Sequence, residues 1–385
     1  YQTGNIVTFT QDSSVSLTWI VPESIQDYID PTGDLMLGYW WSDQATVTLD
    51  NVSVRYSNAT GTVKKSDTKK KEEAQTAVKN EGAAAVSSEE VNQMSSSEIV
   101  ADMKVGWNLG NTLDSYNTSS SDNETGWGNP KTTKAMIDTV KDAGFNAVRI
   151  PVTWGEHLSA DNTIDADYLN RVQEIVDYAI DDNLYVILNV HHDDALWLHP
   201  TYSEQAAVTE KLTAIWQQLC ERFGDYDHHL VFEGMNEPRV IGSATEWSGG
   251  TPEERDVINQ LYQAFVDTVR ETGGLNADRT LIISSHAQSI TKEAVSAVKI
   301  PDDAHIAVSI HSYAPWDFCG TDDTRSDWGS DADKQELDTN FQYLEDTFIS
   351  KGVPVLLDEF GAVNKNNTSI RAQYYAYYVK SAKAH

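Results

Sequence analysis

The chain of 385 residues carries 28 basic and 59 acidic residues, which gives a formal net charge of −31 at pH 7. Charge of this sign and size repels nucleic acid and anionic membrane surfaces, so we predict neither as a partner. No run approaches the roughly 18 apolar residues of a membrane span, and the two cysteines, Cys220 and Cys319, which we expect to be buried thiols, are too few for a disulfide framework or a metal-ligand cluster.

Residues 1–56 alternate in the manner of β-strands. Val15, Leu17 and Trp19 share one face, and the alternation slips by one residue at positions 50–51, where we predict a β-bulge or a tight bend. About four or five short strands are few for a sandwich domain. We therefore predict a partial β-sandwich module, the C-terminal part of a larger one.

Residues 57–94 are predicted to be a polar linker. The periodicity is lost after Ser57, and the run KKSDTKKKEE (residues 64–73) is followed by alanines and serines. Such a composition cannot bury enough apolar surface to fold by itself. A short charged helix around residues 69–79 is the alternative, and in either case the segment separates two bodies.

From residue 95 onward, apolar runs alternate with amphipathic stretches, a rhythm typical of a parallel α/β sheet. The predicted strands are 105–109, 147–152, 185–190, 230–234, 280–284, 306–310 and 353–357, and the predicted helices include 131–143, 166–181, 205–223, 253–272 and 371–384. A (β/α)8 barrel of the TIM type needs about 250 residues. We predict such a barrel over residues 95–385, C-terminally truncated so that its eighth strand and helix are missing.

Polar residues follow five of these strands at the same end. The clusters are 149–154, 191–194, 236–238, 311–316 and 358–361. In a barrel of parallel strands, the carboxyl ends of the strands meet at one mouth, where residues far apart in sequence face each other. A single glutamate at a strand end is more simply a structural ion pair. Five clusters would need five separate structural explanations, so we predict a functional site.

Residues 95–385 resemble glycoside hydrolase family 5, of the cellulase type. The resemblance rests on GWNLGNTL (residues 106–113), RIP (149–151), HH (191–192), NEP (236–238), His311 with Tyr313, and EFG (359–361). It implies a (β/α)8 barrel that cleaves internal β-1,4 bonds with retention of configuration. One residue of the family pattern, a tryptophan after the eighth strand, has no counterpart before His385.

The resemblance also implies catalytic roles for two glutamates. Glu237, after the fourth strand, is expected to be the acid/base, and Glu359, after the seventh, the nucleophile. Retention requires the two carboxyl groups to lie about 5–5.5 Å apart. We expect Arg149 to keep Glu359 ionised and the Tyr313 hydroxyl to orient it. Asn236 is similar to the family residue that hydrogen-bonds the sugar 2-hydroxyl group.

Other residues at the strand ends are candidates for substrate binding. We expect the −1 subsite to be shaped by His191, His192 and His311. A sugar platform is expected of Trp316. The side chains of Asn108 and Asn111 are expected to reach the −2 sugar or to cap turns. Trp154 is an equally good platform or core residue. Strand alternation points Asp358 away from the mouth, where it would serve as an anchor.

A metal site is the competing interpretation of the histidine pair. His192, Asp193 and Asp194 offer nitrogen and oxygen ligands, but glycoside hydrolysis requires neither a metal nor another cofactor, so we predict none. The 11 tryptophans and 17 tyrosines suit a protein that stacks on sugar rings. Taken together, these features predict a secreted, extracellular and monomeric endo-β-1,4-glucanase.

Its substrate is expected to be β-glucan, either cellulose or mixed-linkage glucan, with xyloglucan as a further candidate. Two other functions stay open. The first is an endo-mannanase or xylanase on the same scaffold, and the second is a non-catalytic glucan-binding protein. For residues 1–56, we expect either a carbohydrate-binding module that uses Trp19, Trp40 and Trp41, or an accessory β domain that only packs.

Overall fold

The computed structural model describes residues 87–119, 123–321 and 324–385. The predictions for residues 1–56, the charged helix and most of the linker lie outside these residues. Within them, seven parallel strands form one sheet in sequence order. The strands are β1 (Gly106–Asn108), β2 (Ala147–Ile150), β3 (Tyr185–Asn189), β4 (Leu230–Glu233), β5 (Leu281–Ser289), β6 (Ile306–His311) and β7 (Val355–Glu359).

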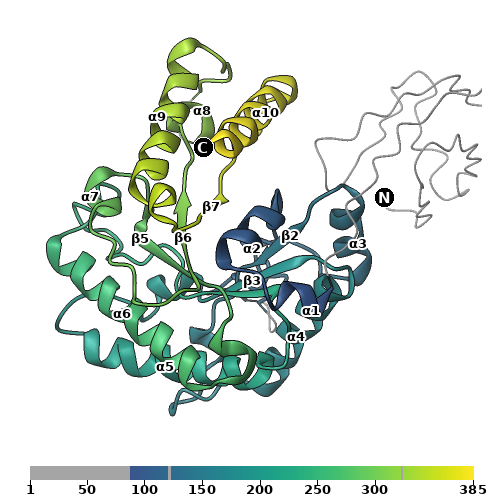
Figure 1. The fold of residues 1–385 in the computed structure, drawn as a ribbon, viewed down its shortest axis with the longest axis vertical. Helices are drawn as coiled ribbons and strands as arrows, with labels where there is room; N and C mark the ends of the chain where they lie inside the picture. The colour runs from purple at the N-terminus through teal and green to yellow at the C-terminus, as the bar shows by residue number, and fades with distance from the viewer. Residues whose placement is uncertain (1–86, 120–122, 322–323) are drawn as a thin grey trace, which may run out of the picture. The chain divides into compact units, whose positions relative to one another are not determined.

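Helices follow or precede these strands in the rhythm of a TIM-type barrel, which confirms the predicted fold class. They are α1 (Ser88–Val91), α2 (Ser96–Met103), α3 (Lys134–Asp142), α4 (Ala166–Asp181), α5 (Gln205–Phe223), α6 (Pro252–Glu271), α7 (Lys292–Val295), α8 (Trp316–Cys319), α9 (Asp331–Thr347) and α10 (Thr368–Ala384). Figure 1 shows α3 to α6 on the outside of the strands. The ranges predicted for α4 and α5 match in full.

The barrel wall is built from strands that are apolar on both faces. In β3, Val186 and Leu188 pack against the outer helices, whereas Tyr185 and Ile187 point into the barrel. This is the period of two that a strand imposes on its side chains. The helices complete the outer layer with one apolar stripe each, such as the buried side chains of Val208, Leu212, Ile215, Trp216 and Leu219 on α5.

Helices α1 and α2 close the amino-terminal end of the barrel. Each begins with a capping box, Ser87 with Glu90 and Ser95 with Glu98. Their apolar residues pack against inward-facing strand residues in one buried cluster, made of Val91, Ile99, Met103, Ala147, Tyr185, Ile187, Val231, Ile282, Ala307 and Leu356. Because full burial of one such side chain contributes about 1.5–3 kcal/mol, this plug is a substantial part of the core.

The barrel body begins earlier in the chain than residue 95, where it was predicted to start. Helix α1 lies inside the range 57–94 that was predicted to be linker, and its Val91 is fully buried. The sequence SEEV contains only one apolar residue, which is too little for a periodicity argument. The two cysteines are buried free thiols, as predicted.

Two strands carry irregularities that shape the interior. In β5, the residue paired with β6 moves from Ser284 to Ser289 while the partner moves only from Ser309 to His311. In β7, the paired residue moves from Leu356 to Glu359 over the same step of β6. Both strands therefore hold extra residues, which is the definition of a β-bulge and a common device beside active sites.

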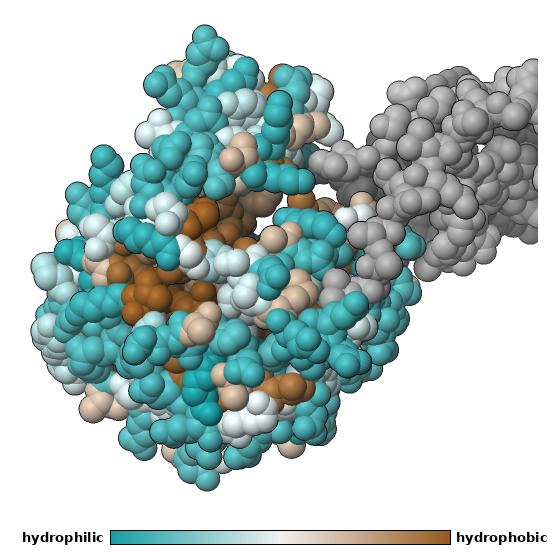
Figure 2. Space-filling model, in the orientation of Figure 1, coloured by the Kyte–Doolittle hydropathy of each residue, from teal (hydrophilic) through white to brown (hydrophobic). Residues whose placement is uncertain are grey.

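The first and last strands of the described sheet lie close to each other. β1 pairs with β2 and β7 pairs with β6, and the side chain of Asn108 donates a 2.8 Å hydrogen bond to the carbonyl oxygen of Asp358 between β1 and β7. Figure 2 shows mostly polar residues over the outer helices and apolar residues toward the middle of the face in view. No helix among the described residues has the length and apolar character needed to cross a membrane.

Candidate active site

Above the apolar plug, the barrel interior turns polar around Arg149 on β2. Its guanidinium forms a two-pronged ion pair with Glu233 on β4, with Nε 2.6 Å from Oε2 and Nη2 2.8 Å from Oε1. Both side chains are almost fully buried. Paired, charge-assisted hydrogen bonds of this geometry are the strongest that side chains make, so Arg149 is rigidly held.

The outer edge of the Arg149 guanidinium reaches the predicted catalytic residues. Nη1 lies 2.7 Å from Oε1 of Glu359, and Nη2 donates to Oδ1 of Asn236 at 2.7 Å. Nη1 also donates to Oδ1 of Asn108 at 3.1 Å. One buried cation therefore fixes side chains that come from β1, from the loop after β4, and from β7.

Glu359 has the environment of a permanently ionised carboxylate. Burial opposes its charge, but the cations of His311 and Arg149 and a hydrogen bond from Tyr313 outweigh burial and lower its pKa to about 2. The Tyr313 hydroxyl donates to Oε2 at 2.8 Å. The predicted positions of Arg149 and Tyr313 beside Glu359 are therefore what the structure shows.

Glu237 lies in the loop after β4 and faces Glu359. Its Oε1 is 2.8 Å from Nδ1 of His311, and its Oε2 is 3.3 Å from Nη1 of Arg239. One oxygen from each glutamate and one His311 nitrogen all lie within 4.8 Å of one another. The backbone of Glu237 is left-handed, with φ of 40°. Such a conformation is uncommon for a residue with a side chain and concentrates at functional sites.

His311 connects the two glutamates. It is buried, and although burial disfavours its charged form, the carboxylates of Glu359, Asp358 and Glu237 raise its pKa to about 10. Its Nδ1 lies 3.6 Å from Oε2 of Glu359, and its Nε2 lies 3.4 Å from Oδ1 of Asp358. These carboxylates therefore favour the imidazolium form of the ring.

The histidine pair after β3 divides into one inner and one outer residue. His191 is buried beside Asn189, and burial together with the charges of His192 and Arg149 lowers its pKa well below the ordinary value. Its Nε2 is 4.0 Å from Oε1 of Glu359. His192 is partly exposed, and its ring lies 5.6 Å from those of Tyr116 and Trp127. These two aromatic rings were not predicted as part of the site.

Two candidates have side chains that are engaged by other groups of the protein. Both ends of the Asn108 side-chain amide are occupied, by Arg149 and by the Asp358 carbonyl, so this residue ties the first strand to the last. Trp154 is fully buried and donates its ring N–H to the carbonyl of Asn189 at 2.9 Å, which favours its core role. Asn111 has a left-handed φ of 56° in the turn after β1.

Trp316 has the exposure that a sugar platform needs. It is 60% exposed at the start of α8, and its ring meets that of Tyr313 edge to face at 6.5 Å between centroids. Because Tyr313 bonds Glu359, one aromatic ring stands between the exposed indole and the nucleophile.

Asp358 does not turn away from the interior, so that expectation is wrong. It accepts a hydrogen bond from Ser309 and lies 3.6 Å from Nε of Arg149. The reason is the bulge in β7, which places Asp358 and Glu359 on the same side in spite of their adjacency. Its anchoring role is consistent with its nearly complete burial.

The metal-ligand set considered from sequence is not assembled. Asp193 accepts hydrogen bonds from the backbone N–H groups of Trp154 and Gly155, and Asp194 pairs with Arg239 at 2.6 Å. A different trio, Asp114, His191 and His192, brings three ligand atoms within 4.8 Å. Two other trios of the described residues include His311, whose positive charge opposes a bound cation.

Besides the Tyr116 and Trp127 rings, three residues of the site were missed in the sequence. Glu233 and Gln288 are fully buried in the interior, and Arg239 stands between Asp194 and Glu237. Glu233 could have been found, because a charged residue inside an apolar strand is almost never buried without a partner. Gln288 gave no signal, since its position depends on the bulge in β5.

Comparison with known proteins covers the described barrel. The sequence profile of the family described as cellulase (glycosyl hydrolase family 5) matches residues 108–385. A second profile, of a domain of unknown function (DUF5620), matches residues 1–55. Endoglucanase A of Clostridium longisporum is 50% identical over 296 residues, which cover 75% of this chain and 57% of that protein. The chain thus spans less than two thirds of that relative.

Solved structures are similar over the same region. A broad-specificity endoglucanase from Clostridium longisporum superposes with a TM-score of 0.73 at 48% identity and covers 76% of this chain and 86% of that one. A xyloglucan-specific endo-β-1,4-glucanase from a metagenomic library, in complex with cellotriose, gives a TM-score of 0.72 at 46% identity, covering 74% of this chain and 86% of that chain.

Proposed function

The chain belongs to the cellulase family of glycosyl hydrolases, family 5, and from this premise we propose that it hydrolyses internal β-1,4 bonds of β-glucan with retention of configuration. The observation that carries the proposal is the pair of glutamates after β4 and β7. Oxygen atoms of Glu237 and Glu359 lie within 4.8 Å of each other. Retaining enzymes hold their carboxyl groups about 5–5.5 Å apart, whereas inverting enzymes leave about 6.5–9.5 Å for a water molecule.

In the first step, a carboxylate oxygen of Glu359 attacks the anomeric carbon while the glycosidic bond breaks. Glu237 gives its proton to the departing oxygen. In the second step, Glu237 takes a proton from water, the water oxygen bonds to the anomeric carbon, and Glu359 is released. Each glutamate returns to its starting state, and the sum is the addition of one water molecule.

Glu359 is assigned as the nucleophile because its environment keeps it ionised. Arg149 and Tyr313 bind one oxygen each, which also fixes the direction of attack. Glu237 is assigned as the acid/base because it faces Glu359 from the loop after β4, with carboxylate oxygens of the two residues within 4.8 Å. Asn236 uses its oxygen to bind Arg149, so its amide nitrogen is the group available for a sugar hydroxyl.

The substrate class follows from the relatives. The two named above are a broad-specificity endoglucanase and a xyloglucan-specific enzyme, so we place cellulose, mixed-linkage glucan and xyloglucan within the range of this chain. The exposed Trp316 and the Trp127 ring beside His192 suit neutral sugar rings, which stack on flat aromatic faces. Action outside the cell follows from a polymeric substrate that does not cross membranes.

Substitution of each glutamate tests the proposal. Glu359→Ala should abolish turnover, and sodium azide should restore it with a glycosyl azide of inverted configuration as product. Glu237→Ala should retain cleavage of a dinitrophenyl cellobioside, whose leaving group needs little protonation, and should lose roughly 10²–10⁴-fold on cellulose oligosaccharides. The measurements are product NMR and initial rates.

Glu253→Ala, at an exposed carboxylate on α6, is the matched control and should keep full activity. If Glu237→Ala lost both substrates equally, its role as acid would be wrong. Higher rates on mannan or xylan than on any glucan would instead move the substrate assignment to an endo-mannanase or xylanase. Binding of glucan without any hydrolysis would favour the non-catalytic alternative.

A further inference from the structure

The bulge in β5 connects the barrel wall to the loop that carries Glu237. Ala287 and Gln288 within it are left-handed, with φ of 52° and 48°. Two consecutive residues with side chains in this conformation are costly and persist only when the surroundings hold them in place. The proposed mechanism assigns no task to either residue.

Gln288 is turned into the interior and is fully buried. Its Oε1 accepts the backbone N–H of Glu237 at 2.6 Å. Its Nε2 donates to Oε1 of Glu233 at 3.2 Å and to the hydroxyl of Ser309. The side-chain amide therefore links the backbone of Glu237 to the Arg149–Glu233 ion pair and to β6.

The neighbouring residue makes a second connection to the same loop. The backbone N–H of Ala287 donates to the carbonyl oxygen of Pro238 at 3.1 Å. Glu237 is thus held by hydrogen bonds on both sides, at its own N–H and at the carbonyl of the residue that follows. These two hydrogen bonds flank the residue whose backbone is itself left-handed, Glu237.

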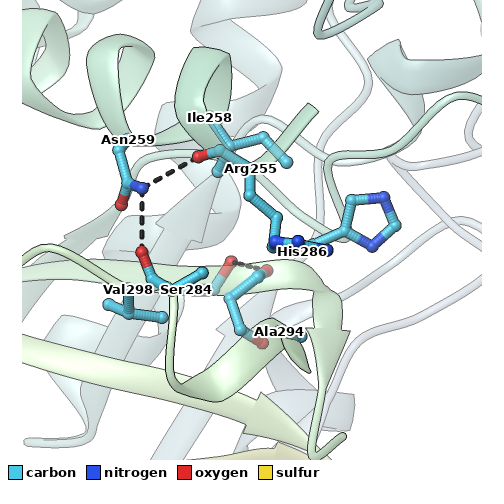
Figure 3. Close-up of a pocket in the computed structure, with 9 residues that line it drawn as sticks. Arg255, Ile258, Asn259, Ser284, His286, Ala294 and Val298 are labelled. Atoms are coloured by element: carbon cyan, nitrogen blue, oxygen red, sulfur yellow. Dashed lines mark hydrogen bonds between the residues drawn. The ribbon is translucent and has the colours of Figure 1, made fainter. Parts of the chain in front are cut away.

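The outer side of the bulge is anchored in the helix layer. His286 is buried, and its Nε2 lies 2.6 Å from Oε2 of Glu254 on α6. Gly250 packs so closely that an added Cβ would lie 2.4 Å from His286 Nε2. Figure 3 shows His286 and Ser284 at a small pocket beside Asn259 and Ala294. The bulge is therefore held both on the side of the helix layer and on the side of the Glu237 loop.

From this geometry we propose that Gln288 is a positioning residue for the acid/base glutamate. It acts through the backbone of Glu237: its amide holds the left-handed turn that aims the Glu237 carboxyl group across the cleft at the glycosidic oxygen. This inference rests on the proposed double displacement. Gln288 contacts Glu237 directly but reaches Glu359 only through Glu233 and Arg149, so the inference assigns it to proton transfer rather than to nucleophilic attack.

The leaving group separates this role from a structural one. Loss of proton delivery slows the departure of a poor leaving group and spares a good one, whereas a damaged fold slows both alike. Gln288→Met keeps the length of the side chain and removes both hydrogen-bonding functions. We expect kcat/KM to fall about tenfold or more for cellotetraose and less than about threefold for dinitrophenyl cellobioside.

Ser285→Ala is the matched control in the same bulge. It removes the hydrogen bond from Ser285 Oγ to the carbonyl of Ser289 at 2.7 Å and touches nothing in the Glu237 loop. Its ratio of the two kcat/KM values should equal that of the unaltered protein. If Gln288→Met does not fold, Gln288→Asn replaces it: the shorter amide stays in the pocket but withdraws from Glu237, and the same change in ratio is expected.

An equal fall on both substrates in a folded Gln288 variant would overturn the inference, and so would an unchanged ratio. Thermal unfolding of each variant establishes that it is folded. The test of Gln288 is separate from the test of the proposed function, because the activity of the unaltered protein tests the proposed function. If it hydrolysed neither substrate, the glucanase assignment would fail before any variant was compared.

Discussion

Arg149 is the buried cation that holds the charged side chains at the mouth of the barrel in place. It contacts Glu233, Glu359 and Asn236 and is almost fully buried. A buried ion pair of this kind adds little net stability, yet removal of one partner is costly because the other charge stays buried. The value of the arrangement therefore lies in geometry: two glutamates from different strands are held against one rigid cation.

The first prediction concerns the protonation of two buried histidines. His311 should stay an imidazolium between about pH 6 and 8, and His191 should stay neutral, because their pKa values are displaced in opposite directions. Since the folded state raises the pKa of His311 to about 10, this proton stabilises the fold fully below the ordinary value of 6.5. The contribution is lost as the pH rises toward 10. Imidazole nitrogen NMR is the measurement.

Glu359→Gln should lower the pKa of His311, because it removes the largest favourable charge beside the ring. Glu246→Gln is the matched control, since Glu246 bonds Arg239 rather than His311. A His311 that titrates near its ordinary pKa in the unaltered protein would contradict the assigned network.

The second prediction concerns metal ions. Asp114, His191 and His192 could contribute one ligand atom each, but the Asp114 carboxylate already accepts the backbone N–H groups of Asn111 and Thr112. We expect treatment with EDTA to leave the hydrolysis rate unchanged, because the proposed mechanism contains no Lewis acid. Loss of activity that Zn²⁺ restores, with Mg²⁺ as the control, would turn the trio into a ligand set.

At the scale of elements, helix α2 carries the third prediction. Ile99 is fully buried in the plug at the amino-terminal end of the barrel. Ile99→Ala should lower the free energy of unfolding by roughly 2–5 kcal/mol, since it removes apolar contacts and leaves a cavity. Ser97→Ala, at an exposed position of the same helix, should change it by less than about 0.5 kcal/mol. Denaturant unfolding followed by fluorescence compares the two, and similar losses would mean that α2 is not part of the core.

The helices and strands also show which features of the fold could be predicted from sequence patterns. Strands such as β3 were found within one residue, because a strand buried on both faces is a continuous apolar run. β5 continues to Ser289 through Ser-Ser-His-Ala-Gln-Ser, which has a single apolar residue and no alternation, so its second half was missed. The positions of Gln288 and Asp358 follow from bulges, and a bulge reverses the side to which a residue points without changing the local sequence pattern.

At the scale of the whole molecule, the net charge of −31 leads to the fourth prediction. Like charges on a compact protein repel one another and destabilise it. The Debye length falls from about 30 Å at 0.01 M salt to about 8 Å at 0.15 M, so added salt should raise the melting temperature. Calorimetry in NaCl and in choline chloride at equal ionic strength separates screening from ion binding. A melting temperature that falls in both salts would contradict this expectation.

The closed end of the barrel decides how a long substrate can reach the glutamates. Because α1 and α2 fill that end with apolar side chains, nothing can be threaded along the barrel axis. In the proposed function, a polysaccharide therefore binds across the mouth from outside the barrel. The plug thus leaves the mouth as the single entrance and exit for the substrate and products of the proposed reaction.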